Sequence, residues 1–140
     1  MNYDEITASN LIKIDLDGKP IEPTGHSLNY AGFVIHSVIH MAKTDKNRVV
    51  MHTRTRAGMV AAALEDDLLP ILMTATQFYG DIAYHDYEGV SIYLDGRECL
   101  LEALGVAKAM IMRNHGLLTV GRTVPEAFLN LYRLERACQV

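Results

Sequence analysis

Hydrophobic and polar positions along the chain follow two periods in turn, which predicts alternating strands and helices. A period near two, or a short unbroken apolar run, is typical of a strand, whereas apolar residues three and four apart mark one face of a helix. The predicted strands are residues 11–16, 48–53, 81–84, 90–94, 107–113 and 117–121. The predicted helices are residues 29–42, 57–64, 97–104 and 123–140, with a short helix or turn at 74–79. The pattern is that of an α/β protein, with the buried run at 48–53 expected in the centre of the sheet.

Turn-forming residues separate these elements. Residues 17–18 (Asp-Gly) close the first strand, and Gly105 ends a helix. Residues 114–116 (Asn-His-Gly) form a tight turn between two apolar strands, where a side chain can be held over the edge of a sheet. Residues 123–126 (Thr-Val-Pro-Glu) have the spacing of a capping box and open the last helix. The apolar face of that helix carries Ala127, Leu131, Leu134 and Cys138.

Length and composition predict a single domain over residues 1–140. Of the 140 residues, 49% are hydrophobic and 21% charged, which is ordinary for a globular protein with a real core. The last helix reaches Val140 without a cap or a polar tail, and no helix precedes the first strand to cover that end of the sheet. We therefore expect the chain to be part of a longer domain, truncated at both ends.

Charge and cysteine content narrow the partners and the compartment. The formal net charge is −4 and no segment gathers a block of Lys and Arg, so we expect no nucleic-acid partner. The densest basic pair, Arg54 and Arg56, is suited to a single anion. Cys99 and Cys138 lie far apart without CxxC spacing, and with no signal peptide this indicates a reducing, cytoplasmic setting. No apolar run reaches the length of a membrane span, so we expect no membrane partner.

Histidines carry the candidate chemistry. His52 ends a buried strand, and Arg54 points to the same face because side chains alternate along a strand. His115 lies in the tight turn, and His36 and His40 are four apart on one helix face, a spacing that can hold a metal. Neutral imidazole suits Zn²⁺, Fe²⁺ and Ni²⁺, and a catalytic zinc site takes about three protein ligands plus an open position. His52 and His115 supply two such ligands.

Each candidate has an ordinary structural alternative. A single histidine at a strand end is more often a hydrogen-bonded structural residue than a metal ligand. Of His36 and His40, one ring can pack against the sheet while the other faces a neighbouring element. Arg54 and Arg56 can be solvated or paired with nearby acidic side chains, namely Glu65, Asp66 or Asp67. The tyrosines and the glutamate of AYHDYEG can be plain turn residues.

Five stretches resemble the class II aldolase/adducin family. They are EITASNLIKIDLDG, AGFVIHSVIHMAKTDKNRVVMHTRTRAG, LLPI, AYHDYEG and MIMRNHGLLTVGRTVPEAFLNLYRLERAC, which cover nearly the whole chain in the expected order. AGFVIHS, AYHDYEG and RNHGLLTVG resemble the adducin-like branch more than the sugar-phosphate aldolases. The resemblance implies a three-layer α/β/α sandwich on a central mixed sheet, and a homo-oligomer, usually a tetramer, with active sites at subunit boundaries.

The resemblance also implies a chemistry. Enzymes of the family hold substrate oxygens on a divalent metal, usually zinc, which stabilises the enediolate formed when a carbon–carbon bond breaks beside a carbonyl. The family's metal ligands are a His-x-His pair at a strand end and a later His before Gly, which match His52 and His115. The second member of the pair falls on Arg54, which cannot bind a metal. His36 matches a helix histidine that could serve as a substitute ligand, and Gly32 stands where the aldolases, but not the adducin-like branch, place an acid/base glutamate.

Arg54 changes what the resemblance implies for this chain. A guanidinium in this place removes one metal bond and sets a permanent positive charge beside a dication, so we expect zinc to bind weakly or not at all unless His36 or a neighbouring subunit completes the site. The planar guanidinium suits an anion instead. We therefore expect Arg54 and Asn114 to contact a small carbonyl-bearing or anionic substrate.

Three functions remain open from the sequence. The first is a metal-dependent carbon–carbon lyase acting on a small hydroxy-carbonyl or sugar-phosphate-like substrate, impaired by Arg54 and by truncation. The second is a non-catalytic adducin-like module for self-association or partner binding. The third is a truncated product with neither activity. No residue is assigned as catalytic.

Overall fold

Four strands form one mixed sheet in the computed structural model, which describes residues 3–42, 45–87, 89 and 97–140. The strands are β1 (Val49–Thr53), β2 (Ala83–His85), β3 (Ala109–Met112) and β4 (Gly116–Gly121), and their order in the sheet is β1-β4-β3-β2. β4 runs antiparallel to both of its neighbours, and β2 runs parallel to β3. The described residues thus confirm the α/β class.

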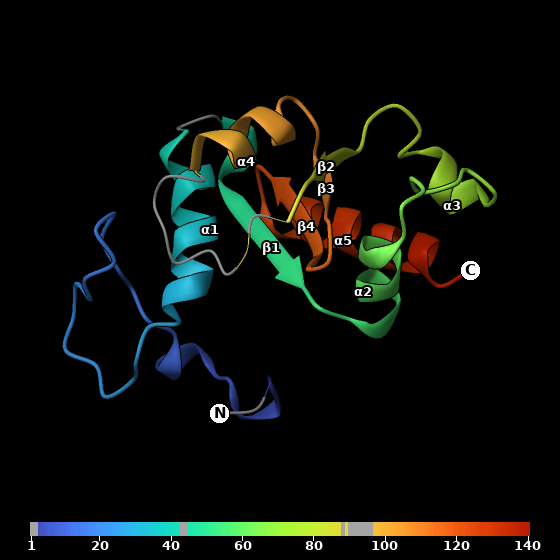
Figure 1. The fold of residues 1–140 in the computed structure, drawn as a ribbon. Coiled ribbons are helices and arrows are strands. Elements are labelled where there is room, and N and C mark those ends of the chain that lie inside the picture. The colour runs from blue at the N-terminus through green and yellow to red at the C-terminus, as the bar shows by residue number, and fades with distance from the viewer. Residues whose placement is uncertain (1–2, 43–44, 88, 90–96) are drawn as a thin grey trace.

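Helices cover both faces of the sheet and make three layers (Figure 1). The helices α1 (Tyr30–Met41) and α4 (Arg97–Leu104) pack on one face. On the other face lie α2 (Arg56–Ala63), α3 (Met73–Thr76) and α5 (Val124–Cys138). Short 3-10 turns are found at η1 (Tyr3–Glu5), η2 (Ala8–Asn10) and η3 (Asp45–Asn47). This arrangement is the expected three-layer α/β/α sandwich.

Alternation along β3 separates two hydrophobic cores. Met110 and Met112 are buried among the side chains of α1 and α4, whereas Ala109 and Ile111 are buried among those of α5. Every residue of β3 and β4 is buried, as is expected for strands covered on both faces. These two strands therefore form the centre of the sheet.

Two expectations about strands are wrong. The strand predicted to be central, β1, lies at an edge of the described sheet and is mostly half-buried. Residues 11–16 form no sheet strand, because only Ile14 pairs, in an isolated bridge with Pro20. The expected turn is present there: the Asp15 carboxylate accepts backbone N–H bonds across it, and Gly18 has a φ of 81°. The predicted strand at 90–94 lies outside the described residues.

Most predicted helix ends are observed. The Asn29 side chain caps α1, and Gly105, with a φ of 50°, follows the end of α4. At α5 the Thr123 hydroxyl accepts the Glu126 N–H at 3.3 Å. The Glu126 carboxylate reaches the N–H of Arg122 at 2.9 Å rather than that of Thr123, so only half of the capping box forms.

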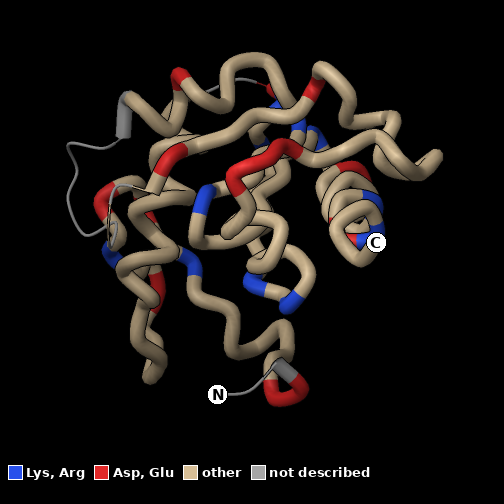
Figure 2. Tube along the Cα trace, turned by 45° about the vertical axis from the view of Figure 1, so that its right-hand side comes forward, with Lys and Arg blue, Asp and Glu red and all other residues tan. Residues whose placement is uncertain are grey.

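Charged side chains are dispersed over the described chain, and Figure 2 shows lysines and arginines spread over several elements rather than gathered on one. Among the described residues, no helix has the length and apolar character needed to cross a membrane.

Candidate functional site

The end of β1 and the turn between β3 and β4 meet at one edge of the sheet. Antiparallel pairing places His52 opposite Leu118 and Thr53 opposite Leu117, so β1 ends beside the start of β4. Asn114 adopts a left-handed conformation with a φ of 55°, and its N–H donates to the carbonyl of Ala62 in α2 at 2.8 Å. A side chain on Gly116 would collide with the Thr53 carbonyl oxygen, so glycine allows the turn to lie against the strand end.

His52 is held in one tautomer by the backbone. Its Nδ1 lies 2.9 Å from the carbonyl oxygen of Leu117, and because a carbonyl can only accept, Nδ1 carries the proton. The lone pair is therefore on Nε2, which is buried without a hydrogen-bond partner among the described residues. Burial lowers the pKa of His52, and the nearby Arg54 charge lowers it further. His52 is thus a neutral imidazole with an unused lone pair.

His115 and Arg54 form a direct hydrogen bond. The Arg54 guanidinium donates from Nη2 to Nε2 of His115 over 2.7 Å. The His115 ring also contacts the His52 ring edge to face, with centroids 4.6 Å apart. Burial lowers the pKa of His115 to about 4, with further lowering by His52, Arg54 and His85. At neutral pH the site therefore holds two neutral imidazoles and one guanidinium.

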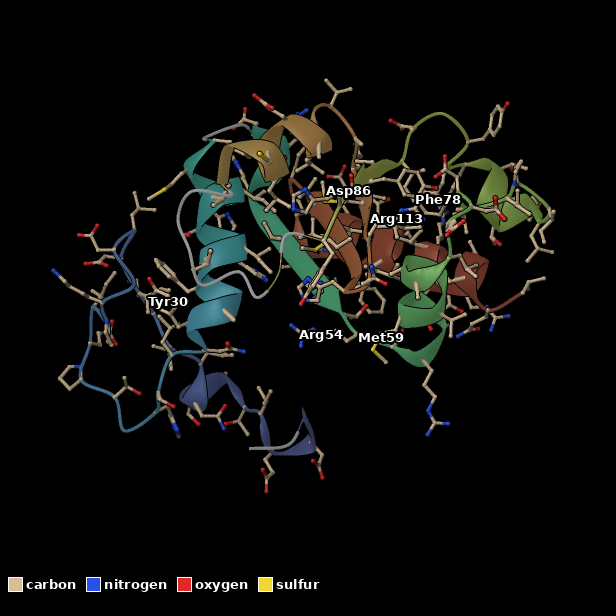
Figure 3. All side chains as sticks on the ribbon, in the orientation of Figure 1. Tyr30, Arg54, Met59, Phe78, Asp86 and Arg113 are labelled. Atoms are coloured by element: carbon tan, nitrogen blue, oxygen red, sulfur yellow. The ribbon has the colours of Figure 1, made fainter. Side chains whose placement is uncertain are left out.

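A cavity of about 290 Å³ opens beside this group, and we call it the Arg54 hollow. Its lining residues are Ala31, Ile35, Arg54, Met59, Tyr87, Gly89, Asn114 and His115. Figure 3 shows Arg54 just beyond the end of β1, near Met59 of α2. Among the described residues Arg54 forms no ion pair with a carboxylate. The hollow therefore has a cationic group that its described surroundings do not neutralise.

His36 faces a different cavity. It is half-buried on α1 and lines a groove of about 470 Å³ together with His40 and the N-terminal segment. The His36 and His40 ring centroids are 6.4 Å apart, and His40 Nδ1 lies 3.1 Å from the carbonyl oxygen of Asn47. Burial, then His40 and His52, lower the pKa of His36. The structure thus brings together His52, His115, Arg54 and Asn114, but does not place His36 among the residues that line the Arg54 hollow.

The side chains, as they stand, do not fit a three-ligand metal site. Within the part of the chain that the structure describes, no three His, Cys, Asp or Glu side chains are grouped as metal ligands. His52 offers a buried lone pair, but Arg54 takes that of His115 and stands where a further ligand would be needed. Of the three positions of such a site, only His52 has a lone pair free for a metal. The lone pair of His115 is taken by Arg54, and Arg54 itself cannot be a ligand.

The sequence did not indicate two anchors that hold this site in place. The Thr55 hydroxyl, next to Arg54, accepts the Gly58 N–H and donates to the Glu135 carboxylate in α5. Thr55 could have been found from its place as the cap of α2, but its partner is 80 residues away in the chain.

The second anchor is Arg113, next to Asn114. It donates to the Leu64 carbonyl at 2.7 Å and to the Asp67 carboxylate at 2.8 Å, and it lies 4.6 Å over the Tyr84 ring. No local pattern marks the contacts with Leu64 and Asp67, because they join residues nearly 50 positions apart. Met59 and Tyr87 were likewise not identified as lining residues, although Tyr87 stands in the AYHDYEG turn.

Comparisons with known proteins agree with this fold. The sequence profile of the Class II Aldolase and Adducin N-terminal domain matches residues 1–140. A Caulobacter vibrioides protein of the class 2 aldolase group is 43% identical over 99% of this chain, and mouse alpha-adducin is 38% identical over 99% of it. The chain spans 53% of the Caulobacter protein and 19% of alpha-adducin.

Two solved structures are similar in both fold and sequence. An aldolase II superfamily protein from Pseudomonas syringae superposes with a TM-score of 0.94 at 50% identity, covering 99% of this chain and 56% of that one. L-fuculose 1-phosphate aldolase from Glaciozyma antarctica superposes with a TM-score of 0.81 at 33% identity, covering 96% of this chain and 51% of that one. With a family profile matched from end to end, this chain belongs to the class II aldolase and adducin family.

Proposed function

We propose that this domain binds a small oxyanion, the carboxylate or phosphate of a hydroxy-carbonyl compound, in the Arg54 hollow. The observation that supports it most is the guanidinium of Arg54, which is bonded to a neutral imidazole and to no carboxylate among the described residues. A planar guanidinium with free N–H groups can hold two oxygens of one anion. Asn114 and Tyr87 add polar groups to the same hollow, which has room for a small molecule.

His115 prepares Arg54 for this role. Because Nε2 of His115 accepts one N–H of Nη2, the guanidinium is held at the rim of the hollow before any ligand arrives. Burial keeps His115 neutral, with a pKa of about 4, so the acceptor stays available throughout the neutral range. A fixed donor loses less side-chain entropy on binding than a free arginine does.

Binding of inorganic phosphate and of 2-phosphoglycolate, measured by calorimetry in buffer containing a chelator, tests this proposal. We expect Arg54→Gln to weaken binding roughly tenfold to a hundredfold, because it removes hydrogen bonds to a charged group. Arg122→Gln makes the same charge change at the opposite end of β4 and is expected to leave the affinity unchanged. Equal affinity of the Arg54 variant and the wild-type chain would contradict the proposal.

A metal-dependent lyase is the second candidate function. Class II aldolases generally depend on a divalent metal, and one solved relative is named for L-fuculose 1-phosphate. In this chain the Nε2 of His52, which is buried and has no hydrogen-bond partner among the residues that the structure describes, favours a metal, because a backbone carbonyl that fixes the tautomer is a common support for a ligating histidine. Stoichiometric zinc in the purified protein, together with zinc-dependent release of an aldehyde from a hydroxy-carbonyl phosphate, would favour this candidate over simple anion binding.

A non-catalytic module is the third candidate, and it takes its support from the similarity to alpha-adducin and from exposed aromatic side chains on α5. Phe128 and Tyr132 are 59% and 55% exposed and stack on each other. A homo-oligomer is expected under this candidate, and light scattering tests it, since a monomer at micromolar concentration would count against it. The cytoplasmic setting stays a prediction.

A further inference from the structure

We infer that Arg54 is the resident cation of the site formed by His52 and His115, and that its guanidinium keeps divalent metals out. This inference concerns competition between two cations for one lone pair, so it does not depend on the anion proposal. The first observation is the 2.7 Å contact between Arg54 Nη2 and His115 Nε2. An imidazole lone pair that accepts an N–H cannot bind a metal at the same time, so any metal must first displace the guanidinium.

His52 shows that the rest of the site still has the arrangement of a ligand pair. Its Nδ1–H is fixed on the Leu117 carbonyl, its Nε2 lone pair is buried, and its ring lies against that of His115. An unpartnered buried nitrogen costs free energy, and a bond to a metal would remove that cost. The two imidazoles are thus placed as a pair, and the guanidinium prevents only one of them from binding.

Charge acts in the same direction as the lost lone pair. The Arg54 guanidinium is cationic, and a metal bound to His52 and His115 would lie close to it. Because Arg54 is exposed, its guanidinium can swing away when a metal binds. Metal binding then costs roughly the lost hydrogen bond between Arg54 and His115, plus part of the repulsion between the guanidinium and the metal. We expect this to weaken metal binding by roughly tenfold to a hundredfold relative to a chain without the guanidinium.

Zinc titration of the wild-type chain and three variants tests the inference, with a chromophoric chelator as competitor. The wild-type chain is expected to hold no stoichiometric zinc, and Arg54→Gln to bind zinc more tightly by the factor above. Arg54→His should bind more tightly still, and its cobalt complex should show the visible absorption of a tetrahedral site. Arg122→Gln serves as the matched control and should behave as the wild type.

The double variant Arg54→Gln, His115→Ala identifies the site, because His36, His40 and His85 could also attract zinc. We expect it to lose the gain that Arg54→Gln produces. If the gain survives the loss of His115, or if the wild-type chain binds one zinc as tightly as the Arg54 variants, the inference is overturned.

Nitrogen chemical shifts of His115 in the unmodified chain give a second readout that does not depend on any variant folding. A neutral ring with an unprotonated, hydrogen-bonded Nε2 is expected in wild-type protein, and a protonated Nε2 would overturn the inference. Failure of phosphate binding, with the zinc pattern as expected, would remove the anion proposal and leave this inference intact. A wild-type chain that holds zinc and still binds phosphate would overturn this inference and leave the anion proposal intact.

Discussion

The Thr55 hydroxyl joins α2 to α5 directly beside Arg54, and its removal gives a measurable perturbation. Thr55→Ala removes the side-chain cap of α2, where Thr55 accepts the Gly58 N–H at 3.1 Å, at a cost of about 1 kcal/mol. It also leaves the Glu135 carboxylate without its Thr55 donor, and a hydrogen bond to a charged group contributes about 1.5–3 kcal/mol. Since Thr55 and Glu135 are only half-buried, we take the lower end of that range and expect a total loss of about 2–3 kcal/mol.

Urea unfolding followed by circular dichroism measures this loss, and a Tm decrease of roughly 5–10 °C should accompany it. Thr55→Ser keeps the hydroxyl and should retain most of the stability. A double-mutant cycle with Glu135→Ala isolates the contact between the two side chains, for which we expect a coupling of about 1 kcal/mol or more. Free energies that simply add, within about 0.5 kcal/mol, would refute the reasoning that these two side chains interact.

Two further predictions concern stability. The Thr53 hydroxyl is buried without a partner among the described residues. Thr53→Val should therefore leave the free energy of unfolding unchanged or raise it by about 1 kcal/mol. A clear loss of stability in urea unfolding would show that the hydroxyl has a partner. The folded-state pKa values of His36, His52 and His115 all lie below the unfolded value, and that of His115 is about 4. As the pH falls below about 6.5 the unfolded chain therefore takes up protons that the folded chain does not, and stability should drop steadily between pH 7.5 and 5.5. Unfolding free energies that are flat over this interval would show that the three imidazoles are not held neutral.

Local patterns placed His52, Arg54 and His115 near one edge of the sheet, but they did not indicate the bond between Arg54 and His115. Strand alternation places His52 and Arg54 on one side, and the turn signal places His115 at an edge, all from neighbouring residues. The hydrogen bond between Arg54 and His115 joins residues 61 positions apart, and it forms because β1 pairs with β4. Spacing on α1 shows that His36 shares a face with His40, but it cannot show which cavity that face lines.

Both wrong strand predictions arise because a local pattern does not report which strands, if any, a segment pairs with. An apolar run such as Val49 to Met51 has the same pattern whether one or both of its edges are paired, so the sequence does not distinguish an edge strand from a central one. At residues 11–16 apolar and polar residues alternate as in a strand, but the polar Asp15 does not face solvent from a sheet. Its carboxylate accepts backbone N–H bonds and fixes a turn. Short polar–apolar alternation therefore predicts extended backbone more securely than it predicts membership of a sheet.

Arg113 limits where this domain can accept added sequence. Surface loops usually tolerate insertions, and residues 64–67 are exposed and form such a loop. Arg113, the residue that precedes Asn114, donates to Leu64, Asp66 and Asp67 of this loop, so a longer loop would pull on the turn that carries His115. A fusion tag or a reporter inserted after Leu64 would therefore disturb the turn that carries His115, although it lies outside the hollow. Residues 22–27 are exposed throughout, and the hydrogen bond from His26 N–H to the Thr24 hydroxyl stays within the segment, so this segment is the better place for such an insertion.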